Sequence, residues 1–292
     1  MTRSLPIWFT LCFVFFASML FSATIASFNT IPSALAQTNA AAISALYSNI
    51  TNTSSAQGLE IKKMINYFDN SSGYLVYPNT ISSASKKVPG VIMIHENRGL
   101  NSYIKDMANT LAKQGYAVLA VDLFKGQTAT NNDQARLLST SVRNNQSEAI
   151  NNLRSAVKYI SSLPFVDPTR IASIGWCFGG GQSLQLALNS QDHPLVATIL
   201  YYGTPLITDS QQLSKIKWPL LGIFGDKDQA NPLPVIKKFK AALDSDKISN
   251  EILIYKGLGH AFANPSNQNY APKETADAWQ KTLAFLKKNA SQ

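Results

Sequence analysis

The feature that most constrains the fold of this chain is an alternation, from about residue 60 onward, of short apolar runs with longer segments of helical period. The apolar runs are continuous and rich in Val, Ile and Leu, as is typical of strands buried on both faces of a parallel sheet. Strands are predicted at 88–95, 116–124, 170–176, 195–203, 219–225 and 251–256, and helices at 102–114, 133–141, 147–161, 180–189, 233–243 and 273–289. An antiparallel hairpin is predicted at 61–77, with its turn at 69–73.

Strands that alternate with helices predict one α/β domain over residues 60–292, with a mostly parallel central sheet and helices on both of its faces. In such folds ligands bind beyond the carboxyl ends of the strands. The residues that follow each strand are therefore the first place to search for a functional site.

The N-terminal part of the chain differs in composition from the rest. Arg3 is followed by a nearly continuous apolar run at 5–26 and then by Ala34-Leu35-Ala36. A positive start, an apolar stretch and small residues before a cleavage point are typical of an export signal. We therefore predict a signal peptide at 1–36.

The apolar run is also long enough, at about 20 residues, to span a bilayer. An uncleaved N-terminal membrane anchor is therefore the alternative to cleavage before Gln37. With either outcome the folded part is expected to be exported, to the extracellular space or the outer face of the cell membrane. Residues 37–59, rich in Ala, Ser, Asn and Thr, are predicted to form a linker.

Charge and cysteine content exclude several classes of function. The formal net charge is +9, but the positive residues are scattered and no nucleic-acid-binding motif accompanies them, so we predict no nucleic-acid partner. Of the two cysteines, Cys12 lies in the export segment and Cys177 is the sole mature cysteine, which excludes an intrachain disulfide and a Cys-based zinc cluster. We predict no metal site, no cofactor and a monomer.

The sequence around Cys177 predicts a nucleophile. Gly175-Trp176-Cys177-Phe178-Gly179 stands between a predicted strand and a predicted helix, where a Gly-x-nucleophile-x-Gly turn is the nucleophile elbow of α/β-hydrolases. In so tight a turn, a side chain at Gly175 or Gly179 would collide with neighbouring backbone. The N-terminus of the following helix favours a thiolate at Cys177.

Two later strand ends carry an acid and a histidine. Asp226 and Asp228 follow the fifth of the six apolar strands, and the spacing Gly-x-x-Asp-x-x-x-Pro favours Asp228 as the acid that orients a histidine. His260 follows the last predicted strand. The chain order nucleophile, acid, histidine is that of the α/β-hydrolases, so Cys177, Asp228 and His260 are predicted to form a catalytic triad.

The HENRG sequence that ends the first apolar strand is expected to complete the site. In this fold that loop supplies one backbone N–H of the oxyanion hole and the residue after the nucleophile supplies the other, which would be Asn97 and Phe178. Glu96 would then approach the Cys177 sulfur, although a salt bridge with Arg98 or a helix cap would also explain an acid here.

Together these motifs resemble the dienelactone hydrolase family. The resemblance rests on Cys177 in GWCFGG, Glu96 in HENRG, Asp228 in GDKDQANP and His260 in GHAF, and it extends over most of the chain after the linker. It implies an α/β-hydrolase fold without a large lid domain, a Cys-His-Asp triad and an acyl-enzyme intermediate. It also implies that Glu96 pairs with the resting thiol and that substrate binding releases the cysteine.

Two positions depart from the dienelactone-cleaving members of that family. Those members hold the substrate carboxylate with two arginines, and the matching positions in this chain are Gly126 and Asn264. We therefore expect a preference for neutral or weakly anionic acyl groups, with Lys125 or Arg98 as a substrate-binding cation.

The sequence thus predicts an exported hydrolase that cleaves a small-molecule carboxylic ester or lactone through a cysteine nucleophile. Two alternatives remain open. The same triad would serve a peptidase or an acyltransferase, and one fold can also host a non-catalytic binding protein.

Overall fold

The structure is a computed structural model, and it describes residues 60–79 and 87–291. The predicted signal peptide or membrane anchor at 1–36 and the predicted linker at 37–59 lie outside these residues. The described residues form one sheet, whose strands are β1 (Glu60–Phe68), β2 (Ser71–Pro78), β3 (Val88–Ile94), β4 (Ala117–Val121), β5 (Val166–Trp176), β6 (Ala197–Tyr201), β7 (Leu220–Gly225) and β8 (Asn250–Tyr255).

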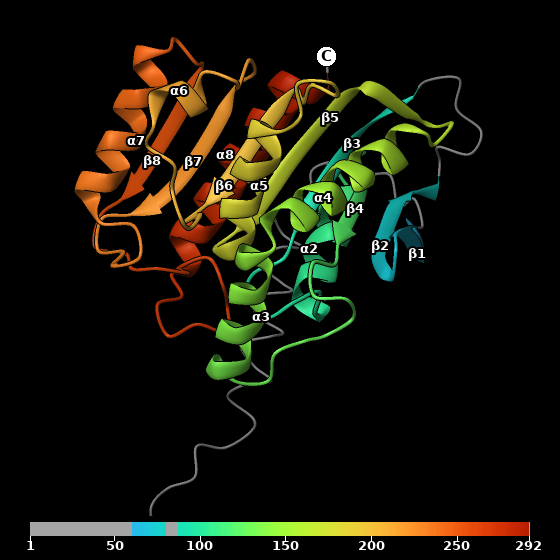
Figure 1. The fold of residues 1–292 in the computed structure, drawn as a ribbon, viewed down its shortest axis with the longest axis horizontal. Coiled ribbons are helices and arrows are strands. Elements are labelled where there is room, and N and C mark those ends of the chain that lie inside the picture. Colours follow the sequence, from blue (N-terminus) through green and yellow to red (C-terminus); the bar gives the residue numbers. More distant parts are fainter. Residues whose placement is uncertain (1–59, 80–86, 292) are drawn as a thin grey trace, which may run out of the picture. The chain divides into compact units, whose positions relative to one another are not determined.

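The order of the strands across the sheet is β1-β2-β4-β3-β5-β6-β7-β8 (Figure 1). All neighbouring pairs from β4 to β8 are parallel, whereas β2 runs antiparallel to both of its neighbours. The predicted mostly parallel sheet and the predicted hairpin, which is formed by β1 and β2, are both confirmed.

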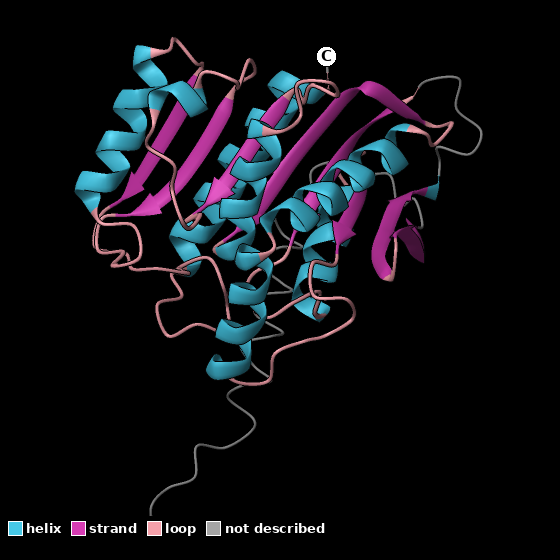
Figure 2. Cartoon of the chain, in the orientation of Figure 1, coloured by secondary structure: helices cyan, strands magenta, loops and turns pink. Residues whose placement is uncertain are grey.

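Helices cover both faces of the sheet, as predicted (Figure 2). The helices are α2 (Ser102–Ala112), α3 (Asn132–Asn144), α4 (Gln146–Ser161), α5 (Phe178–Leu188), α6 (Ser210–Leu213), α7 (Leu233–Ser245) and α8 (Pro272–Ala290). One apolar core joins α4, α5 and α7 to one face, and a second core joins α2 and α8 to the other.

The alternation of strand side chains explains why the apolar runs are continuous. In β3, Val91 and Met93 pack in the core under α2 and α8, whereas Ile92 and Ile94 pack in the core under α4 and α5. Successive side chains of a strand point to opposite faces, so a sheet covered on both faces needs apolar residues at every position.

Some element boundaries differ from the prediction for local reasons. β5 begins at Val166, which pairs with Val88, and so starts before the predicted strand at 170–176. The prediction missed this part because the residues after Val166 are partly exposed and polar and lack the apolar pattern. α5 begins directly after Cys177, which serves as its N-terminal cap residue. The four-residue α6 was not predicted, because one turn is too short to show a helical period.

The segment between β4 and α4 contributes α3, which extends past the carboxyl ends of the strands (Figure 1). No large lid domain interrupts the part of the chain that the structure describes. In the same residues no helix is long and apolar enough to cross a membrane, and no group of three His, Cys, Asp or Glu side chains could hold a metal ion.

Candidate active site

Cys177 lies on the tight turn between β5 and α5. Its backbone has a φ of 53° and a ψ of −119°, and a positive φ is uncommon for a residue other than glycine. A Cβ atom on Gly175 would overlap the carbonyl of Gly179, and a Cβ atom on Gly179 would overlap the carbonyl of His95. The predicted physical reason for both glycines is therefore confirmed.

Three loops at the carboxyl end of the sheet bring Cys177, His260 and Asp228 together. The Sγ atom of Cys177 is 3.1 Å from Nε2 of His260, and Nδ1 of His260 is 2.9 Å from Oδ2 of Asp228. Cys177 is partly buried and Asp228 is almost fully buried. Residues far apart in the sequence thus form one continuous chain of hydrogen bonds.

The structure distinguishes the two acids that follow β7. Oδ1 of Asp228 accepts hydrogen bonds from the N–H groups of Ala230 at 2.8 Å and Asn231 at 3.2 Å, which directs Oδ2 toward His260. Asp226 instead accepts the N–H of Gly257 at 2.6 Å and holds the turn after β8. Asp228 is therefore the partner of His260, and Asp226 has a turn-forming contact.

The protonation states of the acid and the histidine follow from these contacts. Burial raises the pKa of Asp228, but the hydrogen bond from His260 and the two backbone N–H groups outweigh it, and the pKa lies below its ordinary value. Burial lowers the pKa of His260, but the hydrogen bonds with Asp228 and Cys177 outweigh it and raise the pKa to about 10. An ionised Asp228 makes Nδ1–H of His260 the donor, so Nε2 is the atom that faces the sulfur.

Glu96 lies in the same cavity but has partners other than the expected thiol. It is 5% exposed, its Oε1 accepts the hydroxyl of Tyr202 at 3.3 Å, and its Oε2 accepts Nδ2 of Asn264. Burial raises the pKa of Glu96 to about 7, and these two hydrogen bonds reverse only part of that rise. Among the described residues, Glu96 makes neither the expected contact with the Cys177 sulfur nor a salt bridge with Arg98.

A buried histidine that the sequence did not single out fixes the loop after β3. Nε2 of His95 accepts the N–H of Leu123 at 3.1 Å, so Nδ1 carries the proton and donates it to the carbonyl of Glu96 at 2.6 Å. Burial lowers the pKa of His95, which keeps the ring neutral. His95 thereby ties the backbone of Glu96 to the loop after β4.

The two predicted oxyanion-hole residues both adjoin Cys177. Asn97 lines the same cavity, in a turn that Gly99 closes by donating to the carbonyl of Glu96 at 3.3 Å. Phe178 is the first residue of α5, whose N–H has no partner within the helix. Its ring packs against the rings of His95 and Phe124 and does not line the cavity in front of Cys177.

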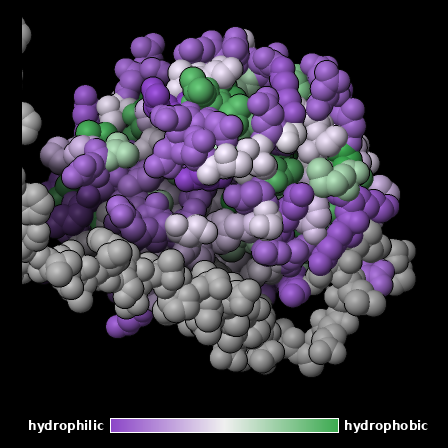
Figure 3. All heavy atoms as spheres, turned by 90° about the horizontal axis from the view of Figure 1, so that it is seen from below, coloured by the Kyte–Doolittle hydropathy of each residue, from purple (hydrophilic) through white to green (hydrophobic). Residues whose placement is uncertain are grey.

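A cavity of about 440 Å³ lies in front of Cys177 and His260, and we call it the Cys177 cavity. The loops after β3, β4, β5 and β8 line it, and most of its lining side chains are polar. Besides His260, these are Glu96, Asn97, Arg98, Asn101, Tyr103, Thr128, Asn132, Asn264, Ser266 and Asn267. The strand arrows in Figure 2 point toward the lower face of the molecule. Figure 3 shows this face, and the described residues visible on it are mostly hydrophilic.

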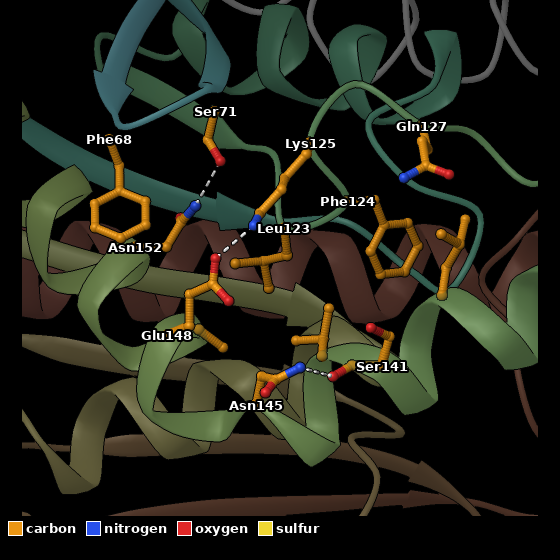
Figure 4. A pocket seen from close by; sticks show the side chains of 13 residues that line it. Phe68, Ser71, Leu123, Phe124, Lys125, Gln127, Ser141, Asn145, Glu148 and Asn152 are labelled. Atoms are coloured by element: carbon orange, nitrogen blue, oxygen red, sulfur yellow. Dashed lines mark hydrogen bonds and ion pairs between the residues drawn. The ribbon is translucent and has the colours of Figure 1, made fainter.

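The two cations predicted to bind substrate are in different places. Arg98 lines the Cys177 cavity, and its Nη2 donates to Oδ1 of Asn132 at 2.8 Å. Lys125 lines a separate cavity of about 160 Å³, where its Nζ forms an ion pair with Glu148 at 2.6 Å (Figure 4). The structure therefore does not bring Lys125 to the Cys177 cavity. The loop after β4 turns between the two cavities, with Lys125 facing one and Thr128 the other.

Tyr202 and Asn264 are the site residues whose contacts the sequence did not predict. Tyr202 follows β6 with a φ of 38°, and its ring meets that of His260 with the centroids 5.1 Å apart. Burial raises the pKa of Tyr202 well above its ordinary value, which keeps its hydroxyl protonated as a donor to Glu96. The rule that ligands bind beyond strand ends points to Tyr202, but it does not reveal the contact with Glu96.

The family model described as "Dienelactone hydrolase family" matches residues 72–290. The chain belongs to this family. One relative, "Protein usf" of Aquifex pyrophilus, is 29% identical over 68% of this chain and 87% of its own length. Another, "Probable 2-oxo-3-(5-oxofuran-2-ylidene)propanoate lactonase" of a Bradyrhizobium species, is 27% identical over 69% of this chain and 84% of its own length.

Solved structures show the same fold. The crystal structure of a dienelactone hydrolase-like promiscuous phosphotriesterase from metagenomic libraries superposes with a TM-score of 0.72 at 22% identity, over 80% of this chain and 99% of that one. The predicted α/β-hydrolase fold is confirmed. Membership of the dienelactone hydrolase family also confirms the predicted class of enzyme, a hydrolase of carboxylic esters or lactones.

Proposed function

We propose that this protein cleaves a small-molecule carboxylic ester or lactone with Cys177 as nucleophile, His260 as acid and base, and Asp228 as the group that orients His260. The observation that supports this most strongly is the hydrogen-bonded chain from Sγ of Cys177 through His260 to Asp228, with links of 3.1 and 2.9 Å. A nucleophile, a base within hydrogen-bond reach and a third group that orients the base are the elements of nucleophilic catalysis.

The first half of the reaction forms a thioester. A protonated His260 favours the thiolate of Cys177, which attacks the ester carbonyl carbon, forms a C–S bond and moves the carbonyl electron pair onto oxygen. When the tetrahedral intermediate collapses, the bond to the leaving oxygen breaks and Nε2–H of His260 gives its proton to that oxygen. With an ester the products of this half are the free alcohol and the acylated Cys177, and with a lactone the new hydroxyl group stays on the acyl chain that Cys177 carries.

Water completes the second half. Neutral His260 takes a proton from a water molecule through Nε2, and the resulting hydroxide attacks the thioester carbonyl. The C–S bond then breaks, the thiolate returns beside the protonated imidazole, and the acid is released. In both halves the N–H groups of Asn97 and Phe178 would stabilise the charged oxygen, as preorganised donors do in other acyl transfers.

Glu96 has a proposed place in this scheme that depends on movement. To approach the sulfur, its carboxyl group would have to leave Tyr202 and Asn264, to which it is bound in the structure. A group bound in the Cys177 cavity could replace those contacts, because Glu96 and Asn264 both line it.

A screen for turnover tests the proposal. Wild type and Cys177→Ala would be assayed on short-chain p-nitrophenyl esters, small lactones and p-nitroanilide peptides. The proposal expects release from esters or lactones in wild type and none above background in Cys177→Ala. Cleavage confined to the peptides would favour the peptidase alternative, and no turnover on any substrate would favour a binding protein.

The proposal includes an export route for the folded domain. It is supported by the sequence of the first 36 residues, and protein purified from the native host would test it. A mature chain that begins at Gln37 agrees with a cleaved signal peptide. A chain that begins at Met1 in the membrane fraction would indicate an anchor, and one that begins at Met1 in the cytosol would contradict export.

A further inference from the structure

The asparagines of the Cys177 cavity use their oxygen atoms within the protein. Oδ1 of Asn101 accepts the N–H of Ile104 at 3.1 Å, at the N-terminal cap of α2. Oδ1 of Asn132 accepts Nη2 of Arg98 at 2.8 Å, and Oδ1 of Asn267 accepts the N–H of Asn269 at 2.9 Å. Because each partner is a donor, the atom it meets must be the amide oxygen, which fixes the orientation of all three side chains.

The same contacts leave the amide nitrogen atoms unused. In the described residues, Nδ2 of Asn101, Asn132 and Asn267 donates to no protein group, while all three side chains line the Cys177 cavity. Each Nδ2 carries two N–H donors. The side chains that line the cavity thus include three uncharged amides with unused donors, and Arg98 lines the cavity with them.

Two acceptor side chains of the cavity, Glu96 and Asn264, already have partners. Both oxygens of Glu96 are hydrogen-bonded, to Tyr202 and to Asn264, and Oδ1 of Asn264 accepts the N–H of Ser266 at 2.8 Å. A ligand that brings acceptors would satisfy donors that otherwise face solvent.

We propose that the substrate is an uncharged ester or lactone that carries further acceptor oxygens, such as keto, ester or ether groups, in the part held by Asn101, Asn132 and Asn267. This inference rests on the proposed function and names its substrate class. The amide N–H groups carry no charge and match neutral acceptor oxygens, whereas a carboxylate on the substrate would lie in the same cavity as the carboxyl group of Glu96.

The test compares two esters of equal shape. In p-nitrophenyl 5-oxohexanoate a keto oxygen takes the place of a methyl group of p-nitrophenyl 5-methylhexanoate, and the rate of each ester with Cys177→Ala is subtracted as background. Wild type is expected to show a higher kcat/KM for the keto ester, by about 5-fold, since one neutral hydrogen bond changes affinity by about 2- to 10-fold.

The variants Asn101→Asp, Asn132→Asp and Asn267→Asp reverse the exposed group from donor to acceptor. Each keeps the oxygen that its internal hydrogen bond needs, and Asp is as good as Asn at an N-terminal cap. We expect each to lower the ratio of the two kcat/KM values by about 2- to 10-fold. Asn131→Asp is the control, because Asn131 also uses Oδ1 for a cap, with Gln134 at 2.9 Å, but does not line the cavity.

The outcomes separate this inference from the proposed function. If wild type hydrolyses neither ester faster than Cys177→Ala, the proposed function fails and the substrate class fails with it. If wild type hydrolyses both esters with a ratio of one or less, or if the three Asp variants keep the wild-type ratio, the proposed function stands and the substrate class is wrong. A ratio that falls in the Asp variants and stays constant in Asn131→Asp supports the inference.

Discussion

Two cavities in the described part of this protein each contain one glutamate and one lysine or arginine, and these charged side chains have different partners in the two. In the smaller cavity Lys125 and Glu148 pair with each other at 2.6 Å, with side chains 56% and 45% exposed. In the Cys177 cavity Arg98 binds Asn132, and the buried Glu96 binds Tyr202 and Asn264. Two opposite charges that form an ion pair with each other have no unpaired charge to offer a ligand. A charged group that is bound to neutral partners can exchange those partners for a substrate.

The largest effect that would test this contrast concerns Cys177, which lines one cavity and not the other. Cys177→Ala should lower kcat/KM for esters by about 1,000-fold or more, as loss of a nucleophile does in related mechanisms. In wild-type mature protein Cys177 should be the single residue labelled by a thiol reagent, and labelling should abolish turnover. Full hydrolysis after complete alkylation would show that the reaction does not use this thiol.

The next effect compares the two glutamates by their pH-dependent stability. The pKa of Glu96 is about 7 in the folded protein against an ordinary value of 4.5, so the folded state binds more protons than the unfolded state between these values. Stability contributed by this group therefore falls as pH rises from 4.5 to 7, and Glu96→Gln removes that loss. The free energy of unfolding of Glu96→Gln relative to wild type should rise over this range by about 3 kcal/mol.

Denaturant unfolding at several pH values measures this difference. Glu148→Gln is the matched control, because Glu148 lies in the other cavity and is exposed and ion-paired. A constant difference between Glu96→Gln and wild type from pH 4.5 to 8 would contradict the assignment of Glu96 as a buried carboxyl with a raised pKa.

A smaller effect concerns the charge that the Cys177 cavity accepts. The family resemblance implies an arginine at the position of Asn264 in dienelactone-cleaving members, and an amide cannot form a bidentate ion pair with a carboxylate. We expect wild type to prefer an uncharged lactone to dienelactone, and Asn264→Arg to raise the ratio of kcat/KM for dienelactone to that for the uncharged lactone by about 10-fold or more. A wild type that already prefers dienelactone tenfold would contradict this view of the cavity.

The smallest effects separate the two cations. Lys125→Gln should change kcat/KM by less than about 2-fold and stability by less than about 1 kcal/mol, because its ion pair with Glu148 is exposed. Arg98→Gln should lower kcat/KM by about 3- to 10-fold, since Arg98 lines the Cys177 cavity and orients the Asn132 amide. Equal effects of the two substitutions would remove the distinction between the cavities.

Part of this protein is determined by its sequence alone, because the signals are local. Continuous apolar runs require a sheet covered on both faces, and the strand, glycine turn and helix around Cys177 fix the position of that residue by backbone sterics. Cys177, Asp228 and His260 each follow a strand, and the carboxyl ends of parallel strands meet at one edge of the sheet. The sequence therefore also predicts that these three residues lie close together.

The tertiary structure alone decided which groups of different loops touch. The HENRG motif predicts that Glu96 lies near the site. Its carboxyl group binds Tyr202, which follows β6, and Asn264, in the loop after β8, and the sequence does not reveal either contact. Lys125 and Thr128 are three residues apart, yet the turn of their loop puts them in different cavities. The physical reason is that a residue type sets what a side chain can bind, whereas the packing of distant segments sets which of its possible partners lies within hydrogen-bond distance.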